Sequence, residues 1–288
     1  MLVLFLFLAL LAAANIRSIG WGAAVQNASA AAKVLALVGL TAVLFLFGDA
    51  SAGALASPGG LAPASWAGFG VALVAVMWAY DGWADLTFVA GEVRDPGRTL
   101  PRALFGGTAA VVAVYLLVNA AYLYVLPVER MAGSPLVAAD AATRVFGAAG
   151  ASVVAALVML STFGALNGST MTGPRIFFAM AEDGLFFRPI ASVHPRFRTP
   201  YASIGLAAAL GIAYVSVRSF ERLAGDFILG IWPFYALAVA AVFVLRRRPG
   251  LERPYRTPGY PFVPLVFLFA SVAMVANYLV QEPVATLR

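Results

Sequence analysis

Long apolar segments alternate with short polar ones along the whole chain. Eight of them are predicted to be membrane-spanning helices, because a helix of roughly 20 apolar residues crosses a bilayer. Their predicted bounds are residues 1–15, 28–47, 66–92, 104–126, 148–181, 202–217, 227–245 and 262–280. The first segment is shorter than a full span, so we interpret it as the later part of a helix. The pattern predicts an all-α integral membrane protein with one membrane domain over residues 1–288.

The third segment, residues 66–92, carries acidic residues inside an apolar run. Asp81 lies beside Gly82, between the aromatic residues Tyr80 and Trp83. An ionisable group at membrane depth costs at least a few kcal/mol and therefore marks a functional site by default. Glycine lets the backbone leave the helix, and unwound backbone at this depth needs protein or a water-filled cavity around it. We predict a discontinuous helix here, an arrangement typical of small-molecule carriers.

Five aromatic and acidic residues in this segment recur at helical spacing and would share one face of an unbroken helix. They are Trp78, Asp81, Asp85, Phe88 and Glu92. Such a face is expected to look into the helix bundle or a cavity. Two alternatives stay open: Asp81 can cap the helix that resumes after Gly82, and Trp78 can either cover a ligand or simply pack.

Composition narrows the class of protein. The chain is 62% hydrophobic and 11% charged, whereas soluble domains carry about a quarter charged residues. It has no cysteine and one histidine, so no disulfide framework, metal site or other cofactor is predicted. No catalytic residue set and no phosphate-binding motif is found. Passive or ion-coupled transport is therefore favoured over an enzyme or an ATP-driven pump.

Basic residues indicate the orientation of the chain. Fourteen of the 19 lysines and arginines belong to alternate loops and the span ends beside them. An excess of basic residues is typical of cytoplasmic loops. We predict a multi-pass protein of the cytoplasmic (inner) membrane with cytoplasmic loops at residues 16–27, 93–103, 182–201 and 246–261. This pattern also explains the net charge of +6 without any nucleic acid partner.

A few polar or small residues lie within the other spans. Lys33 is the only lysine, and by itself it is expected to extend to the lipid headgroups. Trp232, beside Pro233, predicts a kink with an inward-facing aromatic side chain. The fifth span has a small, hydroxyl-bearing face that predicts close helix packing. This face consists of Ser161, Gly164, Gly168 and Thr172.

Five stretches carry a family resemblance. They are NIRSIGWGAAVQNASAAAK (Asn15–Lys33), WAYDGWADLTFVAGEVRDPGRTLPRAL (Trp78–Leu104), STFGALNGSTMTGPRIFFAMAEDG (Ser161–Gly184), HPRFRTP (His194–Pro200) and RPYRTPGYPFVP (Arg253–Pro264). With them the chain resembles the amino acid–polyamine–organocation permeases, particularly the L-type amino acid transporter branch.

The resemblance implies secondary transport of amino acids by alternating access, on a fold of two inverted five-helix repeats. It aligns this chain with the stretch from the fourth to the eleventh of twelve family helices. The family's broken first helix, which holds the substrate carboxylate, has no counterpart here. The alternative is therefore a non-transporting membrane fragment or interaction subunit. Members include uniporters, exchangers and proton symporters. Expected partners are an amino acid and membrane lipid, with either a second copy or a partner subunit.

The resemblance also assigns roles to single residues. Trp78 matches an aromatic gate, and the segment from Tyr80 to Trp83 matches the unwound stretch that meets the substrate's amino group. Lys33 matches a lysine that replaces a sodium ion near Ser161 and Thr162, which implies sodium-independent transport. Asp81 departs from the small residue often found there, and it either senses protons or favours a cationic substrate. The substrate-binding residues implied are Trp78, Tyr80, Asp81, Gly82, Trp83 and Trp232.

Overall fold

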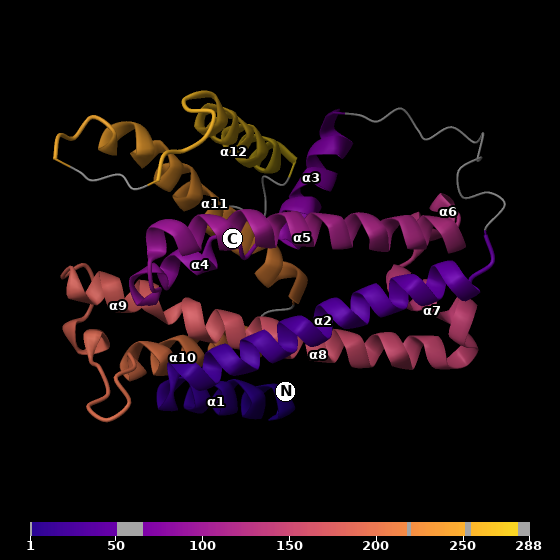
Figure 1. The fold of residues 1–288 in the computed structure, drawn as a ribbon, viewed down its shortest axis with the longest axis horizontal. Coiled ribbons are helices and arrows are strands. Elements are labelled where there is room, and N and C mark those ends of the chain that lie inside the picture. Colours follow the sequence, from indigo (N-terminus) through magenta and orange to yellow (C-terminus); the bar gives the residue numbers. More distant parts are fainter. Residues whose placement is uncertain (1, 51–65, 218–219, 251–254, 282–288) are drawn as a thin grey trace. The chain divides into compact units, whose positions relative to one another are not determined.

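Every regular element that the computed structural model describes is a helix, over residues 2–50, 66–217, 220–250 and 255–281. The elements are α1 (Leu2–Arg17), α2 (Ile19–Phe47), α3 (Trp66–Tyr80), α4 (Asp85–Phe88), η1 (Ala90–Glu92), α5 (Pro96–Val125), α6 (Val128–Gly133), α7 (Val137–Phe146), η2 (Gly147–Ala149), α8 (Gly150–Thr172), α9 (Pro174–Glu182), η3 (Arg188–Ala191), α10 (Tyr201–Val217), α11 (Phe220–Leu245) and α12 (Phe262–Gln281). Among the described residues, three stretches are long and apolar enough to cross a membrane: Gly20–Phe47, Pro96–Val125 and Val137–Glu182. Shorter apolar helices accompany them (Figure 1).

The chain divides into two compact units, which are described separately. The first contains α1, α2, α4, η1, most of α5, α6 to α9 and most of α10. The second contains α3 with the turn after it, residues 94–99, the end of α10 from Tyr214, α11 and α12. One boundary between the units lies between Ala84 and Asp85. The two halves of the segment at residues 66–92 therefore belong to different units.

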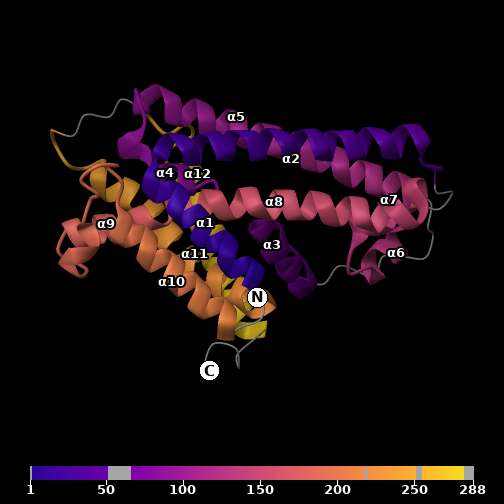
Figure 2. The same ribbon diagram turned by 90° about the horizontal axis from the view of Figure 1, so that it is seen from below.

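The first unit is built around the antiparallel pair α2 and α8, with α7 packed against both (Figures 1 and 2). Gly164 on α8 lies so close to α2 that an added Cβ would be 2.6 Å from the Ser29 hydroxyl oxygen. The small residue therefore sets the approach of the two helices, as in other membrane helix pairs. An apolar core shared by α2, α5, α7 and α8 lies further along the pair. It contains Leu40, Leu44, Ala121, Val125, Leu126, Ala141, Ala142 and Val154.

A buried amide network joins α1, α2 and α8. The Asn15 amide donates to the Asn167 Oδ1 at 3.1 Å. Asn167, which is fully buried, donates in turn to the Gly22 carbonyl at 3.0 Å and to the Gln26 Oε1 at 3.1 Å. Buried polar groups need such partners, so these side chains fix the relative position of three helices.

The start of α2 differs from the predicted cytoplasmic loop at residues 16–27. Only Ser18 separates α1 from α2, and its side chain accepts a hydrogen bond from the backbone N–H of Trp21. This is N-cap geometry. The polar residues that suggested a loop, such as Gln26, instead face α8 and take part in the amide network. Polar composition predicted a turn, but interhelical hydrogen bonding makes the segment helical.

Two further predicted loops contain helix. α5 begins at Pro96 rather than at residue 104, because proline is well suited to a first helical turn, and Pro101 lies inside the same helix. Residues 127–147, which lie between two predicted spans, include the short helices α6 and α7. α7 is strongly amphipathic: Ala141 and Ala142 are fully buried in the shared core, whereas Arg144 is exposed.

Candidate functional site

Helix α3 ends where the sequence predicted a break. The Asp81 N–H donates to the Trp78 carbonyl at 3.2 Å in a turn, and Gly82 has a φ of +107°. No atom lies within 4 Å of the place where a Cβ on Gly82 would be. Glycine is therefore required by the backbone conformation, not by lack of space. α4 starts three residues later, at Asp85.

An aromatic cluster from α11 and α12 holds this turn within the second unit. The Tyr235 hydroxyl donates to the Asp81 Oδ1 at 3.3 Å. The Trp83 ring lies 5.3 Å from the Tyr235 ring and 6.3 Å from the Phe267 ring. Trp232 is buried, with its ring 5.7 Å from Tyr235 and 6.2 Å from Phe267. The acidic side chain and one flanking tryptophan are thus held by aromatic packing.

The other predicted substrate residues have different environments. Trp78 makes an edge contact with Phe227, with ring centroids 5.6 Å apart, and 39% of its surface stays exposed. Tyr80 is half-buried. Trp232 is only 4% exposed, and its Nε1 has no hydrogen-bond partner among the residues that the structure describes. Trp78 and Trp83 therefore present surface, whereas Trp232 is buried on α11.

The acidic residues after the break, Asp85 and Glu92, make contacts within the first unit. The Thr172 hydroxyl donates to the Asp85 Oδ2 at 3.3 Å. The Arg175 Nε donates to the Glu92 Oε1 at 3.0 Å, and its Nη1 donates to the Met171 carbonyl. The five residues from Trp78 to Glu92 would share one face only on an unbroken helix. The helix breaks between Tyr80 and Asp85, so the residues before and after the break contact different elements.

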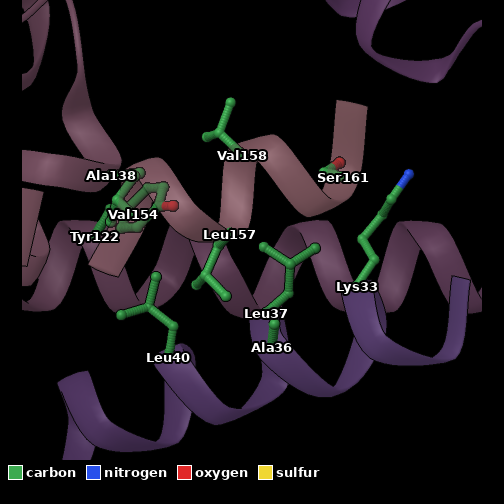
Figure 3. A pocket seen from close by; sticks show the side chains of 10 residues that line it. All are labelled: Lys33, Ala36, Leu37, Leu40, Tyr122, Ala138, Val154, Leu157, Val158 and Ser161. Carbon is green, nitrogen blue, oxygen red and sulfur yellow. The ribbon is translucent and has the colours of Figure 1, made fainter. Parts of the chain in front are cut away.

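Lys33 and Ser161 line one cavity in the first unit, between α2, α5, α7 and α8 (Figure 3). Lys33 is central in α2: at 1.5 Å per residue it is about 21 Å from either end of the helix. It was expected near the start of a span, but α2 begins earlier than predicted. Thr162, the third residue of this predicted group, is exposed and is not among the residues lining the cavity.

Several contacts at the site were not predicted from the sequence. Tyr235 and Phe227 on α11 touch the predicted residues Asp81 and Trp78. The only available signal for Tyr235 was its position three residues after Trp232, on the same face of the helix. The partner of Glu92 was also missed, because Arg175 is 83 residues away in the chain. In the described part of the chain, no group of three or more His, Cys, Asp or Glu residues could hold a metal ion.

Comparison with known proteins supplies the family. The amino acid permease family profile matches residues 1–287. The chain is 36% identical over 218 residues to the serine/threonine exchanger SteT of Bacillus subtilis (strain 168), covering 74% of this chain and 50% of the relative. It is 29% identical over 279 residues to the b(0,+)-type amino acid transporter 1 of Mus musculus, covering 93% and 55%. It is 31% identical over 211 residues to the cystine/glutamate transporter of Homo sapiens, covering 73% and 42%.

The chain spans about half the length of these curated relatives. The match to the family covers nearly every residue, and the relatives are amino acid transporters and exchangers rather than enzymes. Family and apolar helices together make this a multi-pass membrane protein. The resemblance predicted from the five sequence stretches is thus confirmed, and the chain belongs to the amino acid permease family.

Proposed function

We propose that the protein works as a secondary carrier that exchanges amino acids across the cytoplasmic membrane by alternating access. The relative with 36% identity is a serine/threonine exchanger, and exchange of small neutral amino acids is the activity we propose first. Proton-coupled transport and uniport are the other modes that the resemblance implied.

The observation that carries this proposal is the break after Tyr80. It places a turn and a half-buried carboxylate, Asp81, in the middle of an apolar segment. Such a combination is expensive in a membrane unless it serves a site, and discontinuous helices are where carriers bind substrate. The carboxylate is held by Tyr235 at 3.3 Å. It offers a fixed negative charge to a substrate ammonium group, to a cationic side chain or to a transported proton.

Five of the six residues proposed to bind substrate lie at this break, and the sixth, Trp232, lies on α11. Asp81 and the backbone around Gly82 receive the amino group, and the partly exposed Trp78 and Trp83 flank it. Tyr80 and Trp232 complete the proposed set. Trp232 contributes indirectly, because it packs on Tyr235, which donates a hydrogen bond to Asp81. The buried position of Trp232 supports a role in holding the site's shape more than direct contact with substrate.

Lys33 is proposed to take the place of a coupling cation, together with Ser161 and Thr162. Its position in the middle of α2, about 21 Å from either end of the helix, supports this role. Transport is then independent of sodium. Replacing external sodium by choline is expected to leave the exchange rate unchanged, and a strict sodium requirement would rule out this assignment.

We further propose eight spans in one membrane domain, with the ends of α1, η1, α8–α9 and α11 reaching the cytoplasm. Helix occupies part of the proposed cytoplasmic segments at residues 16–27, 93–103 and 182–201. The fourth segment, 246–261, includes residues 251–254, which lie outside the described residues.

The test is counterflow in vesicles reconstituted with the full-length carrier. Vesicles loaded with unlabelled serine are expected to take up labelled serine faster than empty vesicles. Asp81→Asn keeps the shape of the side chain but removes its charge, and we expect it to reduce exchange at least tenfold while the protein still reaches the membrane. Asp183→Asn, at an exposed acid after α9, is the matched control.

The outcomes separate the hypotheses. Wild-type protein that moves no amino acid above background would refute the carrier proposal and favour the alternative of a non-transporting membrane protein. Wild-type exchange with unchanged Asp81→Asn activity would reduce Asp81 to a helix cap. If Asp81→Asn loses exchange of arginine and lysine but keeps exchange of serine, Asp81 is assigned to the recognition of cationic substrates.

A further inference from the structure

The cavity beside Lys33 is an elongated slot with two chemically different ends (Figure 3). Its volume is about 130 Å³. Lys33 and Ser161 lie at one end of the lining, and Tyr122, Ala138 and Val154 lie at the other. The residues that α2 contributes to the lining extend from Lys33 to Leu40, which is about 10 Å along a helix. The slot therefore runs parallel to α2 and α8.

The walls between the two ends are aliphatic. They are formed by Ala36, Leu37, Leu40, Leu157 and Val158 from α2 and α8. An apolar cavity of about 150 Å³ lined by such residues stays dry and takes up a compact hydrocarbon such as benzene. This slot has a similar size, so hydrocarbon suits its walls better than water does.

The cation at one end lacks a protein partner. Lys33 is half-buried, and among the residues that the structure describes no hydrogen bond or ion pair reaches its ammonium group. A charge at this depth is normally paired or faces a water-filled cavity, but the cavity here is apolar. The Ser161 hydroxyl at the same end is a second hydrogen-bond donor. Two donors, one of them cationic, suit a single anionic acceptor group.

We propose that this slot binds a medium-chain aliphatic carboxylate. Its carboxylate pairs with the Lys33 ammonium and the Ser161 hydroxyl, and its hydrocarbon chain lies along Leu37 and Leu157 toward Tyr122. One lysine neutralises one carboxylate, whereas a phosphate group would retain uncompensated charge beside aliphatic walls. The α2 side of the slot measures about 10 Å from Lys33 to Leu40, which matches the length of a medium chain.

This binding does not depend on transport. Because Lys33 is also proposed to occupy the cation position of the carrier, a bound carboxylate would hinder the transport cycle, and that consequence alone rests on the proposed function. Binding and transport are measured separately, so failure of one leaves the other standing.

The test uses the purified full-length protein in vesicles of zwitterionic lipid, with decanoate carrying a diazirine at its last carbon as the probe. After illumination, labelled peptides are identified by mass spectrometry. The label is expected near Leu40, Tyr122 and Val154. Unlabelled octanoate is expected to compete at concentrations at least about tenfold below those at which octanol competes, because a hydrogen bond to a charged group is worth that much or more.

Variants test each end of the slot. Lys33→Gln is expected to weaken octanoate competition at least about tenfold. Leu157→Trp fills the slot and is expected to abolish labelling. Leu160→Trp, on the same helix but not in the lining, is the matched control and is expected to label like wild type. The neutral competitor is compared on wild-type protein, so the proposal stays testable if Leu157→Trp does not fold. Equal competition by octanol and octanoate, undiminished competition in Lys33→Gln, or labelling elsewhere would overturn the proposal.

Discussion

The ion pair between Arg175 and Glu92 offers the sharpest test of how the broken segment is held in the first unit. The Arg175 Nε and the Glu92 Oε1 are 3.0 Å apart, and the two side chains are 7% and 37% exposed. Arg175 also donates to the Met171 carbonyl, one turn earlier on α8. Glu92 is the last residue of η1, so this contact ties the end of the segment to the α8–α9 junction.

The burial of the two partners sets the size of the effect. Removing one partner of a fully buried pair costs about 3–5 kcal/mol, whereas exposed pairs contribute about 0.2–1 kcal/mol. Arg175 resembles the first case, but Glu92 is more than a third exposed, so water can replace part of its contribution. We expect Glu92→Gln to lower the free energy of unfolding by about 1.5–3 kcal/mol, the range for a hydrogen bond to a charged group.

A double-mutant cycle measures the pair itself. The free energy of unfolding of the purified protein in detergent is compared for wild type, Glu92→Gln, Arg175→Met and the double variant. A coupling energy of at least about 1 kcal/mol is expected. Glu182→Gln, an exposed acid at the end of α9, is the control and should change stability by less than about 0.5 kcal/mol. A coupling energy within the usual additivity error, about 0.5 kcal/mol, would refute the reasoning.

The same variants should loosen the segment locally. The chain has no cysteine, so Gly91→Cys introduces a single thiol into it, at an exposed position where a Cβ meets no atom within 4 Å. A nitroxide spin label on this thiol should be more mobile in Arg175→Met than in wild type, as measured by its electron paramagnetic resonance spectrum. Unchanged mobility would mean that the segment is held by other contacts.

Three further substitutions test single contacts. Gly82→Ala should cost about 1–3 kcal/mol in the free energy of unfolding, because its φ of +107° disfavours any side chain; a smaller loss would show that the turn can relax. Gly164→Val should lower the thermal midpoint by separating α8 from Ser29, where a Cβ would lie 2.6 Å from the hydroxyl oxygen, and an unchanged midpoint would contradict that close approach. Thr199→Val should cost about 1–3 kcal/mol in chemical denaturation, because the buried Thr199 hydroxyl donates to the Ile16 carbonyl near the end of α1; wild-type stability would indicate that water reaches that carbonyl.

Local features of the chain predicted much of the fold. Apolar segments of sufficient length predicted helices, and every described element is helical. The pair Asp81 and Gly82 predicted the break in residues 66–92, because glycine permits the required backbone geometry and an acid does not remain on a lipid-facing helix. Loop boundaries were less accurate. The polar residues of 16–27 predicted a loop, but Gly22 and Gln26 accept hydrogen bonds from Asn167 on α8 and the segment is helical.

The candidate site was only partly predictable. Trp78, Asp81 and Trp83 stood out because polar and aromatic residues are unusual within an apolar segment. Their partners Tyr235 and Phe227 did not, because nothing in the sequence tells which face of α11 meets α3. Whether the substrate-binding residues act as proposed stays a prediction for the transport assays.

The sequence by itself determined the class of the protein, the approximate positions of most long helices and the position of the break. Each of these follows from interactions with water or lipid, or from backbone geometry, which depend on neighbouring residues only. Tertiary structure alone decided that the two halves of the broken segment belong to different units, that Glu92 pairs with Arg175, and that Lys33 ends an apolar slot. These contacts join residues far apart in the chain, and their free energy depends on distances that no local pattern encodes.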